Sequence, residues 1–366
     1  MSTHLIRPPM LADVLPQVDT AWLMQNTGEL WKKELGATYR HYRDAACFTE
    51  TLMKESGLEH VERISFPADG KTTCLDRTMP MAWEATRATL TIKQARVAFA
   101  DPVVASYERH PFHLAEGSVS TPPGGVFTRL ISEEQFFGGE DTENAMVMLD
   151  PGTCPRAPIL RAIGDLGALG FVSDWSSRRH ESPDTMTWFN CCTEGAHWHP
   201  HADDRHFIGF SVSPRTGDQL RAAARSGPVL VHVFSDGCRY AGELDCVTGV
   251  IPGDDPRELW LTAHLYEPLA DDNSAGVVGS IEAARLIRRF IAQGTLAQPH
   301  FTLRLIFTAE MYGFAAYASR VGVPLRDRVL GAINYDSLAI KQAATLCLAP
   351  AAAPFFGDYL LEELMA

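Results

Sequence analysis

The stretch Glu258-Leu-Trp-Leu-Thr-Ala-His264-Leu-Tyr266-Glu267-Pro-Leu-Ala-Asp271-Asp272-Asn273-Ser-Ala-Gly276 joins an apolar segment to a cluster of polar side chains. The apolar residues up to Ala263 follow a polar turn and predict a short buried strand with His264 at its carboxyl end. Asn273 is a good helix-capping residue, so we expect a helix to follow. Open α/β sheets bind ligands at the carboxyl ends of their strands. The stretch therefore predicts a strand, a site and a helix, in that order.

Two later apolar segments also end in acidic residues. Phe301 to Ala309 is followed by Glu310, and Val329 to Tyr335 is followed by Asp336. A succession of strand, helix, strand, helix, strand implies right-handed crossovers between parallel strands. We therefore expect an α/β fold with a mixed, largely parallel sheet sandwiched by helices. Three strands would then bring polar side chains to one edge of that sheet.

The composition is that of a soluble globular protein. The chain has 366 residues, of which 46% are hydrophobic and 21% are charged, which is enough for two domains. A net charge of -13 argues against nucleic acid or an anionic membrane as a partner, because both select clustered Lys and Arg. The sequence shows neither an apolar run of about 18 residues nor a basic, then apolar leader, so we expect no membrane span and no secretory signal.

The eight cysteines are scattered and form no CxxC pair. This usage is typical of reduced thiols, and we therefore expect a cytoplasmic protein without a disulfide framework. The adjacent pair Cys191 and Cys192 is interpreted as two buried thiols, with a metal or redox role as the alternative.

Changes in composition divide the chain into three segments. Residues 1–116 contain an amphipathic helical pattern and then strands, and residues 117–125 are rich in proline and glycine, as linkers are. We expect residues 117–232 to form an inserted, small, mostly β domain and residues 233–366 to complete the main domain. Within that last segment, Cys246 to Ile251 and Glu258 to His264 flank a tight loop and predict a hairpin.

Four side chains at the predicted sheet edge are of the types that bind divalent metals: His264, Asp272, Glu310 and Asp336. Zinc binds neutral imidazole and carboxylate groups at about 2.0 to 2.2 Å. One such carboxylate alone is interpreted as a cap or turn residue. Together, at the ends of consecutive strands, the four indicate a metal site.

A second histidine-rich stretch offers an alternative site. It reads His197-Trp-His199-Pro-His201-Ala-Asp203-Asp204-Arg-His206. Alternating histidines share one face of a strand, so two of them with Asp203 could hold a metal. The competing interpretation is a solvated loop that happens to contain histidines.

The order of residues around the first site resembles the zinc aminopeptidase family that includes bacterial leucyl aminopeptidases and glutaminyl cyclases. The matching features are His264 at a strand end, the turn Asp272-Asn-Ser-Ala-Gly276, the Glu310-Met-Tyr-Gly313 segment and the strand end Asn334-Tyr-Asp336. Three further segments are similar to a poorly characterised branch with an inserted protease-associated (PA) domain: Pro67-Ala-Asp-Gly-Lys71, Met79-Pro-Met-Ala-Trp83 and Thr121-Pro-Pro-Gly-Gly125. The resemblance covers nearly the whole chain.

The resemblance implies a role for each matching residue. His264 and Asp336 would bind a zinc ion, and Asp272 would bind one ion or bridge two. Glu310 would be the general base that takes a proton from the metal-activated water. The Asp272-Asn273 peptide bond would be cis. The implied activity is hydrolysis of a small peptide or amide.

The sequence also departs from the family pattern. Tyr266 replaces the Asp that orients the first imidazole, and Met311 replaces a Glu that binds a second zinc. The late histidine ligand is missing, since no histidine follows His300, so either the chain is truncated or the second metal site is absent.

These departures favour one zinc ion, or another divalent metal, over two. Glu267 or Asp271 could then replace a missing ligand. The alternative function is a catalytically inactive relative that binds a peptide or serves as an accessory factor in a biosynthetic pathway.

Overall fold

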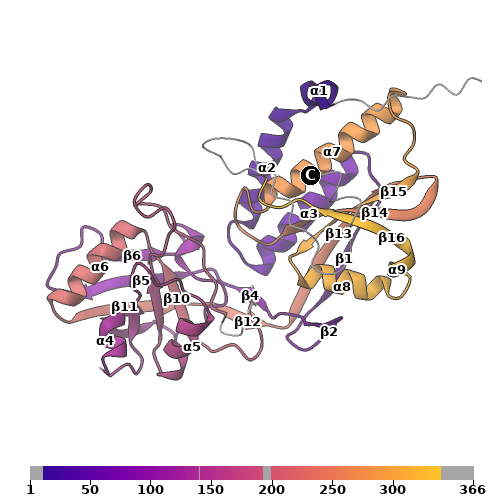
Figure 1. The fold of residues 1–366 in the computed structure, drawn as a ribbon. Helices are drawn as coiled ribbons and strands as arrows, with labels where there is room; N and C mark the ends of the chain where they lie inside the picture. The colour runs from indigo at the N-terminus through magenta and orange to yellow at the C-terminus, as the bar shows by residue number, and fades with distance from the viewer. Residues whose placement is uncertain (1–10, 140, 193–198, 339–366) are drawn as a thin grey trace, which may run out of the picture.

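The computed structural model describes residues 11–139, 141–192 and 199–338, and these form two α/β units (Figure 1). The first unit is built on a five-stranded sheet with the order β1 (Glu59–Ala68), β13 (Gly242–Ile251), β15 (Phe301–Ala309), β14 (Asp255–Leu265) and β16 (Val329–Asn334). β14 pairs in parallel with both β15 and β16, whereas β13 pairs antiparallel with β1 and β15. The predicted mixed α/β fold is confirmed, and the strands that carry the site residues are the parallel ones.

Helices cover both faces of this sheet. Figure 1 shows α2 (Thr20–Glu34), α3 (Tyr39–Glu55) and α7 (Ser274–Ala292) on one side and α8 (Tyr312–Val321) and α9 (Leu325–Arg328) on the other. β15 and β16 lie on opposite sides of β14 in the sheet. α7 connects β14 to β15, and α8 leads from β15 back across β14 towards β16. Right-handed crossovers in opposite directions place their helices on opposite faces. A short helix, α1 (Leu11–Val14), and a 3-10 turn, Leu15–Gln17, precede α2.

The core of the first unit lies between α7, α3 and the sheet. Val247, Leu305 and Phe307 from the central strands belong to the same buried cluster as Ile281 and Ala284 of α7. The apolar positions at helical spacing in the sequence account for this packing. α7 begins where predicted, because the Asn273 side chain accepts a hydrogen bond from the backbone N–H of Gly276 at 3.1 Å.

The hairpin predicted for β13 and β14 is wrong, because β15 lies between these two strands. Thr248 of β13 pairs with Ile306, and Ile306 pairs in turn with Thr262 of β14. The connecting loop is pinned to the start of β15, where the Asp255 N–H donates to the His300 carbonyl at 2.7 Å. The short loop between β13 and β14 therefore crosses over the end of β15, a strand that follows α7 in the sequence.

The second unit contains a seven-stranded sheet. Its order is β10 (Ile208–Ser211), β9 (Gly170–Ser173), β8 (Met146–Met148), β7 (Val126–Ser132), β11 (Val229–Ser235), β5 (Ala88–Gln94) and β6 (Val103–Ser106). β10 to β7 are parallel and the others antiparallel. Three α-helices accompany it in the described residues, α4 (Glu133–Phe137), α5 (Ala157–Asp165) and α6 (Pro214–Ser226), with a 3-10 turn at Pro111–His113. This unit is richer in helix than the sequence indicated.

The second unit begins earlier than the predicted boundary at residue 117. β5 and β6 belong to its sheet because β5 pairs with β11, which comes from the other end of the insertion. The proline and glycine segment expected as a linker connects β6 to β7 inside the unit. The true connection to the first unit is a two-stranded ribbon of β4 (Ala82–Glu84) and β12 (Cys238–Tyr240), next to the hairpin of β2 (Thr73–Cys74) and β3 (Arg77–Thr78).

None of the helices in the described ranges is both long enough and apolar enough to cross a lipid bilayer.

Candidate metal site

His264 lies one residue before the end of β14 and is only 2% exposed. Its Nε2 atom is 3.1 Å from Asp272 Oδ1 and 3.7 Å from Asp336 Oδ1. Asp272 precedes α7, and Asp336 follows β16 directly after Tyr335. The parallel arrangement of β14 and β16 therefore brings together three of the residues that the sequence analysis selected.

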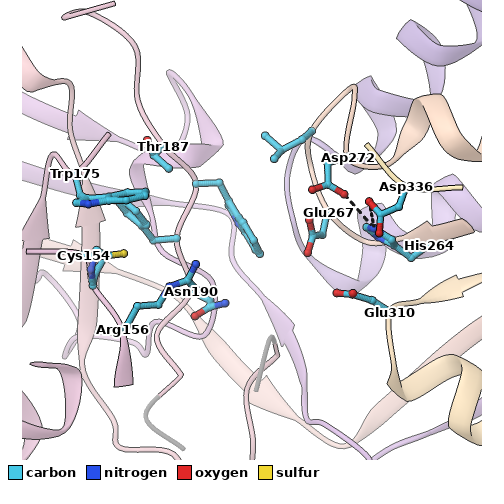
Figure 2. A pocket seen from close by; sticks show the side chains of 14 residues that line it. Cys154, Arg156, Trp175, Thr187, Asn190, His264, Glu267, Asp272, Glu310 and Asp336 are labelled. Carbon is cyan, nitrogen blue, oxygen red and sulfur yellow. Dashed lines mark ion pairs between the residues drawn. The ribbon is translucent and has the colours of Figure 1, made fainter. Parts of the chain in front are cut away.

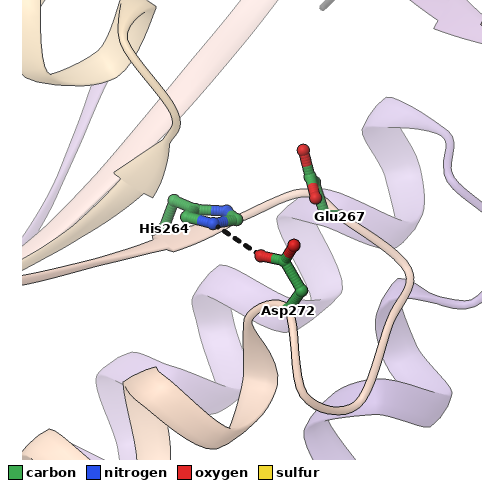
Figure 3. Close-up of side chains that lie close together, drawn as sticks. All are labelled: His264, Glu267 and Asp272. Carbon is green, nitrogen blue, oxygen red and sulfur yellow. Dashed lines mark ion pairs between the residues drawn. The ribbon is translucent and has the colours of Figure 1, made fainter. Parts of the chain in front are cut away.

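Glu267 joins this group. His264, Glu267 and Asp272 each offer a ligand atom, and these atoms all lie within 4.8 Å of one another (Figure 3). Asp271, although it lies in the described part of the chain, does not belong to this group and does not line the adjacent pocket. Of the two replacement ligands considered from the sequence, Glu267 is therefore the one with suitable geometry.

Glu310 follows β15 and lines the same pocket as His264, Glu267, Asp272 and Asp336 (Figure 2). His264 and Ala309 lie at neighbouring ends of the paired strands β14 and β15, since His264 pairs with Thr308 and Leu265 with Ala309. Glu310 thus emerges from the strand beside His264, as the sequence predicted.

Two side chains hold the loop between β14 and α7. The Asp272-Asn273 peptide bond is cis, as the family resemblance implied, and the Asn273 amide donates to the Tyr335 carbonyl at 2.7 Å. Glu34, at the end of α2, accepts hydrogen bonds from the Tyr266 N–H at 2.8 Å and the Ser274 hydroxyl at 3.0 Å. Glu34 therefore braces both ends of the loop that carries Glu267 and Asp272.

The role of Glu34 was not predicted from the sequence. One feature of the sequence could have indicated that Glu34 is buried. Its carboxylate lies one helical turn from the buried Leu30, on the apolar face of α2, where a charged residue needs specific partners.

The side chains of the group perturb one another's pKa values. Burial by itself lowers the pKa of His264, but the neighbouring carboxylates of Asp272 and Asp336 outweigh it and raise the pKa to about 10. The nearby His264 imidazole in turn lowers the pKa of Asp336 to about 2. Burial, reinforced by the neighbouring carboxylates, raises the pKa of Glu267 to about 8, and burial also raises that of Glu310. Several carboxylates thus lie close to one imidazole, and a bound cation would stabilise their ionised forms.

The other ring nitrogen of His264, Nδ1, is buried and is not held by a hydrogen bond within the described residues. Tyr266, two residues after His264, has its backbone at a φ of 80° and is 2% exposed. Its hydroxyl hydrogen-bonds to Glu116 Oε1 at 3.0 Å and so does not contact the imidazole.

The histidines of the alternative site take part in the junction between the two units. His199 Nδ1 lies 3.2 Å from Glu116 Oε1, and the His199 ring packs on Tyr266 with centroids 4.5 Å apart. His201 Nε2 lies 3.0 Å from the hydroxyl of Tyr312. His197 lies outside the described residues. Both rings also lie beside the Tyr312 ring, and neither histidine belongs to a metal-competent group among the described residues, so a structural role accounts for both.

The vicinal cysteines are buried free thiols, in agreement with the first interpretation of the sequence. Burial raises the pKa of Cys191 to about 12, which disfavours its thiolate form.

A cavity of about 260 Å³ separates the metal-competent group from the second unit. Figure 2 shows the two walls facing each other, with Asp272, Glu267, His264 and Glu310 on one side and Arg156, Trp175 and Asn190 on the other. Trp188 and Phe189 also line the second wall. The inserted unit therefore forms one side of the candidate site.

No protein-family model matches the sequence, and no curated protein matches it either. Solved structures do. The alignment with BSAP, a zinc aminopeptidase from Bacillus subtilis, covers 88% of this chain and 69% of that one, with a TM-score of 0.59 and 14% identity. The chain has an aminopeptidase fold. An aminopeptidase from Aneurinibacillus sp. strain AM-1 is similar over 88% of this chain and 71% of its own, with a TM-score of 0.51 and 16% identity.

A peptidase precursor from Shewanella amazonensis is also similar. The alignment covers 87% of this chain and 74% of that one, with a TM-score of 0.55 and 14% identity. At these identities the similarity establishes the aminopeptidase fold, and the chemistry has to be argued from the side chains of this chain.

Proposed function

We propose that this chain is a single-metal, aminopeptidase-like hydrolase that cleaves a small peptide or amide. The observation that carries the proposal is the convergence of His264, Glu267 and Asp272 within 4.8 Å at the carboxyl end of β14. Asp336 and Glu310 line the same pocket, on a fold similar to that of zinc aminopeptidases.

The donor set fits one divalent metal ion. One imidazole nitrogen and carboxylate oxygens are a common set for a catalytic zinc site, which binds three protein groups and leaves a position open. His264, Asp272 and Asp336 would hold the ion, with Glu267 as the replacement ligand. The excess of carboxylates also accommodates harder divalent metals than zinc. The bound ion would polarise the scissile carbonyl and lower the pKa of a water molecule.

Glu310 is the proposed general base. Burial raises the pKa of its carboxyl group, which makes the carboxylate a better proton acceptor near neutral pH. It would take a proton from the attacking water and pass it to the leaving amine. Glu267 adds an acidic side chain to the pocket where a substrate's cationic α-amino group would bind. Equal cleavage of N-acetylated and free substrates would contradict this last assignment.

The inserted unit belongs to the proposal as a PA-like domain that shapes the substrate cleft. It supports this role by providing the wall opposite His264. The reduced cysteines favour a cytoplasmic location for the reaction.

Metal analysis and one substitution test the proposed function. Protein purified with zinc should hold close to one equivalent of metal and hydrolyse aminoacyl amides. Glu310→Gln should abolish turnover and leave the metal bound, because the amide keeps the shape but is no base. Asp271→Asn serves as the matched control, since Asp271 lies outside the group. Loss of the metal together with activity in Glu310→Gln would make Glu310 a ligand instead.

An inactive binding protein is the second candidate. It is favoured by the buried Nδ1 of His264, which lacks the partner that ordinarily orients a metal-bound imidazole. Tyr266 and Met311 at the positions of an expected Asp and Glu point the same way. Less than about 0.2 equivalents of transition metal after zinc-supplemented purification would favour this candidate over the hydrolase.

A further inference from the structure

The two walls of the pocket differ in chemistry. The wall of the first unit presents acceptors, namely the carboxylates of Glu267, Asp272, Glu310 and Asp336 around His264. The wall of the second unit presents aromatic surface and hydrogen-bond donors. Arg156 is the one Lys or Arg among the pocket-lining residues that the structure describes. A ligand that fits both walls must therefore be positive at one end and negative at the other.

Several features make the second wall suited to a carboxylate. Arg156 offers a guanidinium, whose planar fork matches carboxylate oxygens, and the Asn190 carboxamide lines the same side (Figure 2). The N-terminal end of α5, which begins at Ala157, adds positive potential directly next to Arg156. Trp188 Nε1 is buried without an acceptor among the described residues, so a ligand oxygen that reached it would form a new hydrogen bond.

The aromatic part of this wall is fixed in place. Phe189 is buried in a core cluster, and Trp175 packs against that cluster. The two rings lie 6.4 Å apart between centroids at an interplanar angle of 56°. Because these rings are held by the core of the second unit, they offer a preformed apolar surface next to the donors.

From these observations we propose that the substrate is a zwitterionic, dipeptide-sized molecule with a free carboxylate and a large apolar residue at its carboxyl end. The amino end binds the acidic wall, the carboxylate binds Arg156, and the carboxyl-terminal side chain packs on Trp175. This inference rests on the proposed hydrolase function for the orientation of the substrate. The cavity of about 260 Å³ favours a ligand of this small size, since it lies just below the volumes of pockets that bind drug-sized molecules, about 300 to 1,000 Å³.

Three peptides test the inference: Leu-Phe, its carboxyl-terminal amide, and Leu-Ala. In the zinc-loaded wild type, kcat/KM for Leu-Phe should exceed that for the amide by about 10- to 100-fold, through KM, because a charge-assisted hydrogen bond is lost in the amide. Arg156→Gln should reduce this ratio to near one, and Arg156→Lys should restore part of it. Trp175→Ala should remove the preference for Leu-Phe over Leu-Ala but keep the preference for the acid. Arg178→Gln, an exposed arginine of the same unit outside the pocket, is the matched control.

Calorimetry with the zinc-loaded Glu310→Gln variant separates this inference from the proposed function. If the wild type hydrolyses the acid and the amide equally and Arg156→Gln changes neither, the inference is overturned while the hydrolase stands. If nothing is hydrolysed but Leu-Phe binds at least tenfold more tightly than its amide, and Arg156→Gln removes the difference, the inference stands without the hydrolase. Equal binding of the two peptides, or binding of neither, overturns it.

Discussion

Replacing Glu34 with Gln should change how the stability of the protein depends on pH. The Glu34 carboxyl group is 2% exposed and accepts hydrogen bonds from the Tyr266 N–H and the Ser274 hydroxyl. Burial raises its pKa from 4.5 to about 7. In Glu34→Gln the amide oxygen can still accept from Tyr266, and the amide nitrogen can donate to the Ser274 oxygen. The variant thus imitates the protonated carboxyl group at every pH.

The magnitude follows from linkage between protonation and folding. Between about pH 4.5 and 7 the unfolded chain loses the Glu34 proton while the folded protein keeps it, so the free energy of unfolding falls as the pH rises. A shift of roughly 2.5 pKa units corresponds to a loss of about 3 kcal/mol, complete above about pH 7. Glu34→Gln does not lose this stability, because its amide does not titrate. The variant and the wild type should be equally stable at pH 4.5, and the variant should be more stable at pH 8 by up to about 3 kcal/mol.

Urea unfolding in the presence of a chelator, at half-unit steps of pH, measures this difference directly. Subtracting the two curves removes the contribution of the other titrating groups, which the proteins share. Zinc should shrink the difference, because a nearby cation stabilises the ionised form of Glu34. A difference that does not change between pH 4.5 and 8, or a variant that is less stable at pH 8, would refute the reasoning.

Three further predictions follow from the packing and the site. The Arg304 guanidinium donates to the buried Glu258 carboxylate at 2.7 and 2.8 Å. Glu258→Ala removes this acceptor and should lower the free energy of unfolding by about 3 to 5 kcal/mol. Thermal denaturation checks this against Lys32→Ala, which breaks an exposed pair worth about 1 kcal/mol at most. Gly313→Ala should destabilise the protein by about 1 to 3 kcal/mol, since the new Cβ would overlap the Thr308 side chain, whereas the Cβ in Gly279→Ala meets only Leu338 at 3.8 Å and this variant should be tolerated in the same assay. Zinc at about 100 times its Kd should stabilise the wild type by about 2.7 kcal/mol. Asp272→Asn should lose this zinc-dependent shift in Tm and Asp271→Asn should keep it, while equal shifts in both would exclude Asp272 as a ligand.

The positions of the site residues could be predicted because they depend on local sequence. Each of His264, Glu310 and Asp336 follows or ends an apolar segment, and parallel strands end at one edge of a sheet. The Asn273 cap was predictable for the same reason, since the cap and the helix that it begins are adjacent in the sequence.

The errors concern contacts between distant parts of the chain. A short loop with strands on both sides is typical of a hairpin, and the sequence at Pro252 does not indicate that β15 will enter between its neighbours. The early start of the second unit depends likewise on β5 pairing with β11, more than a hundred residues later in the chain. Glu34 and Glu116 could not be assigned partners, because their roles arise from side chains that only the tertiary fold brings close.

The ribbon of β4 and β12 has a consequence for how such a protein can change in evolution. Glu84 and Cys238 are opposite each other in this ribbon, so the chain enters and leaves the second unit only about one strand spacing apart, roughly 5 Å. A tight turn could close the same gap, so the whole unit could be exchanged or deleted without rearranging the five-stranded sheet. The wall that carries Arg156 and Trp175 would go with it. Specificity could therefore be replaced as a single module, while the residues around His264 stay where they are.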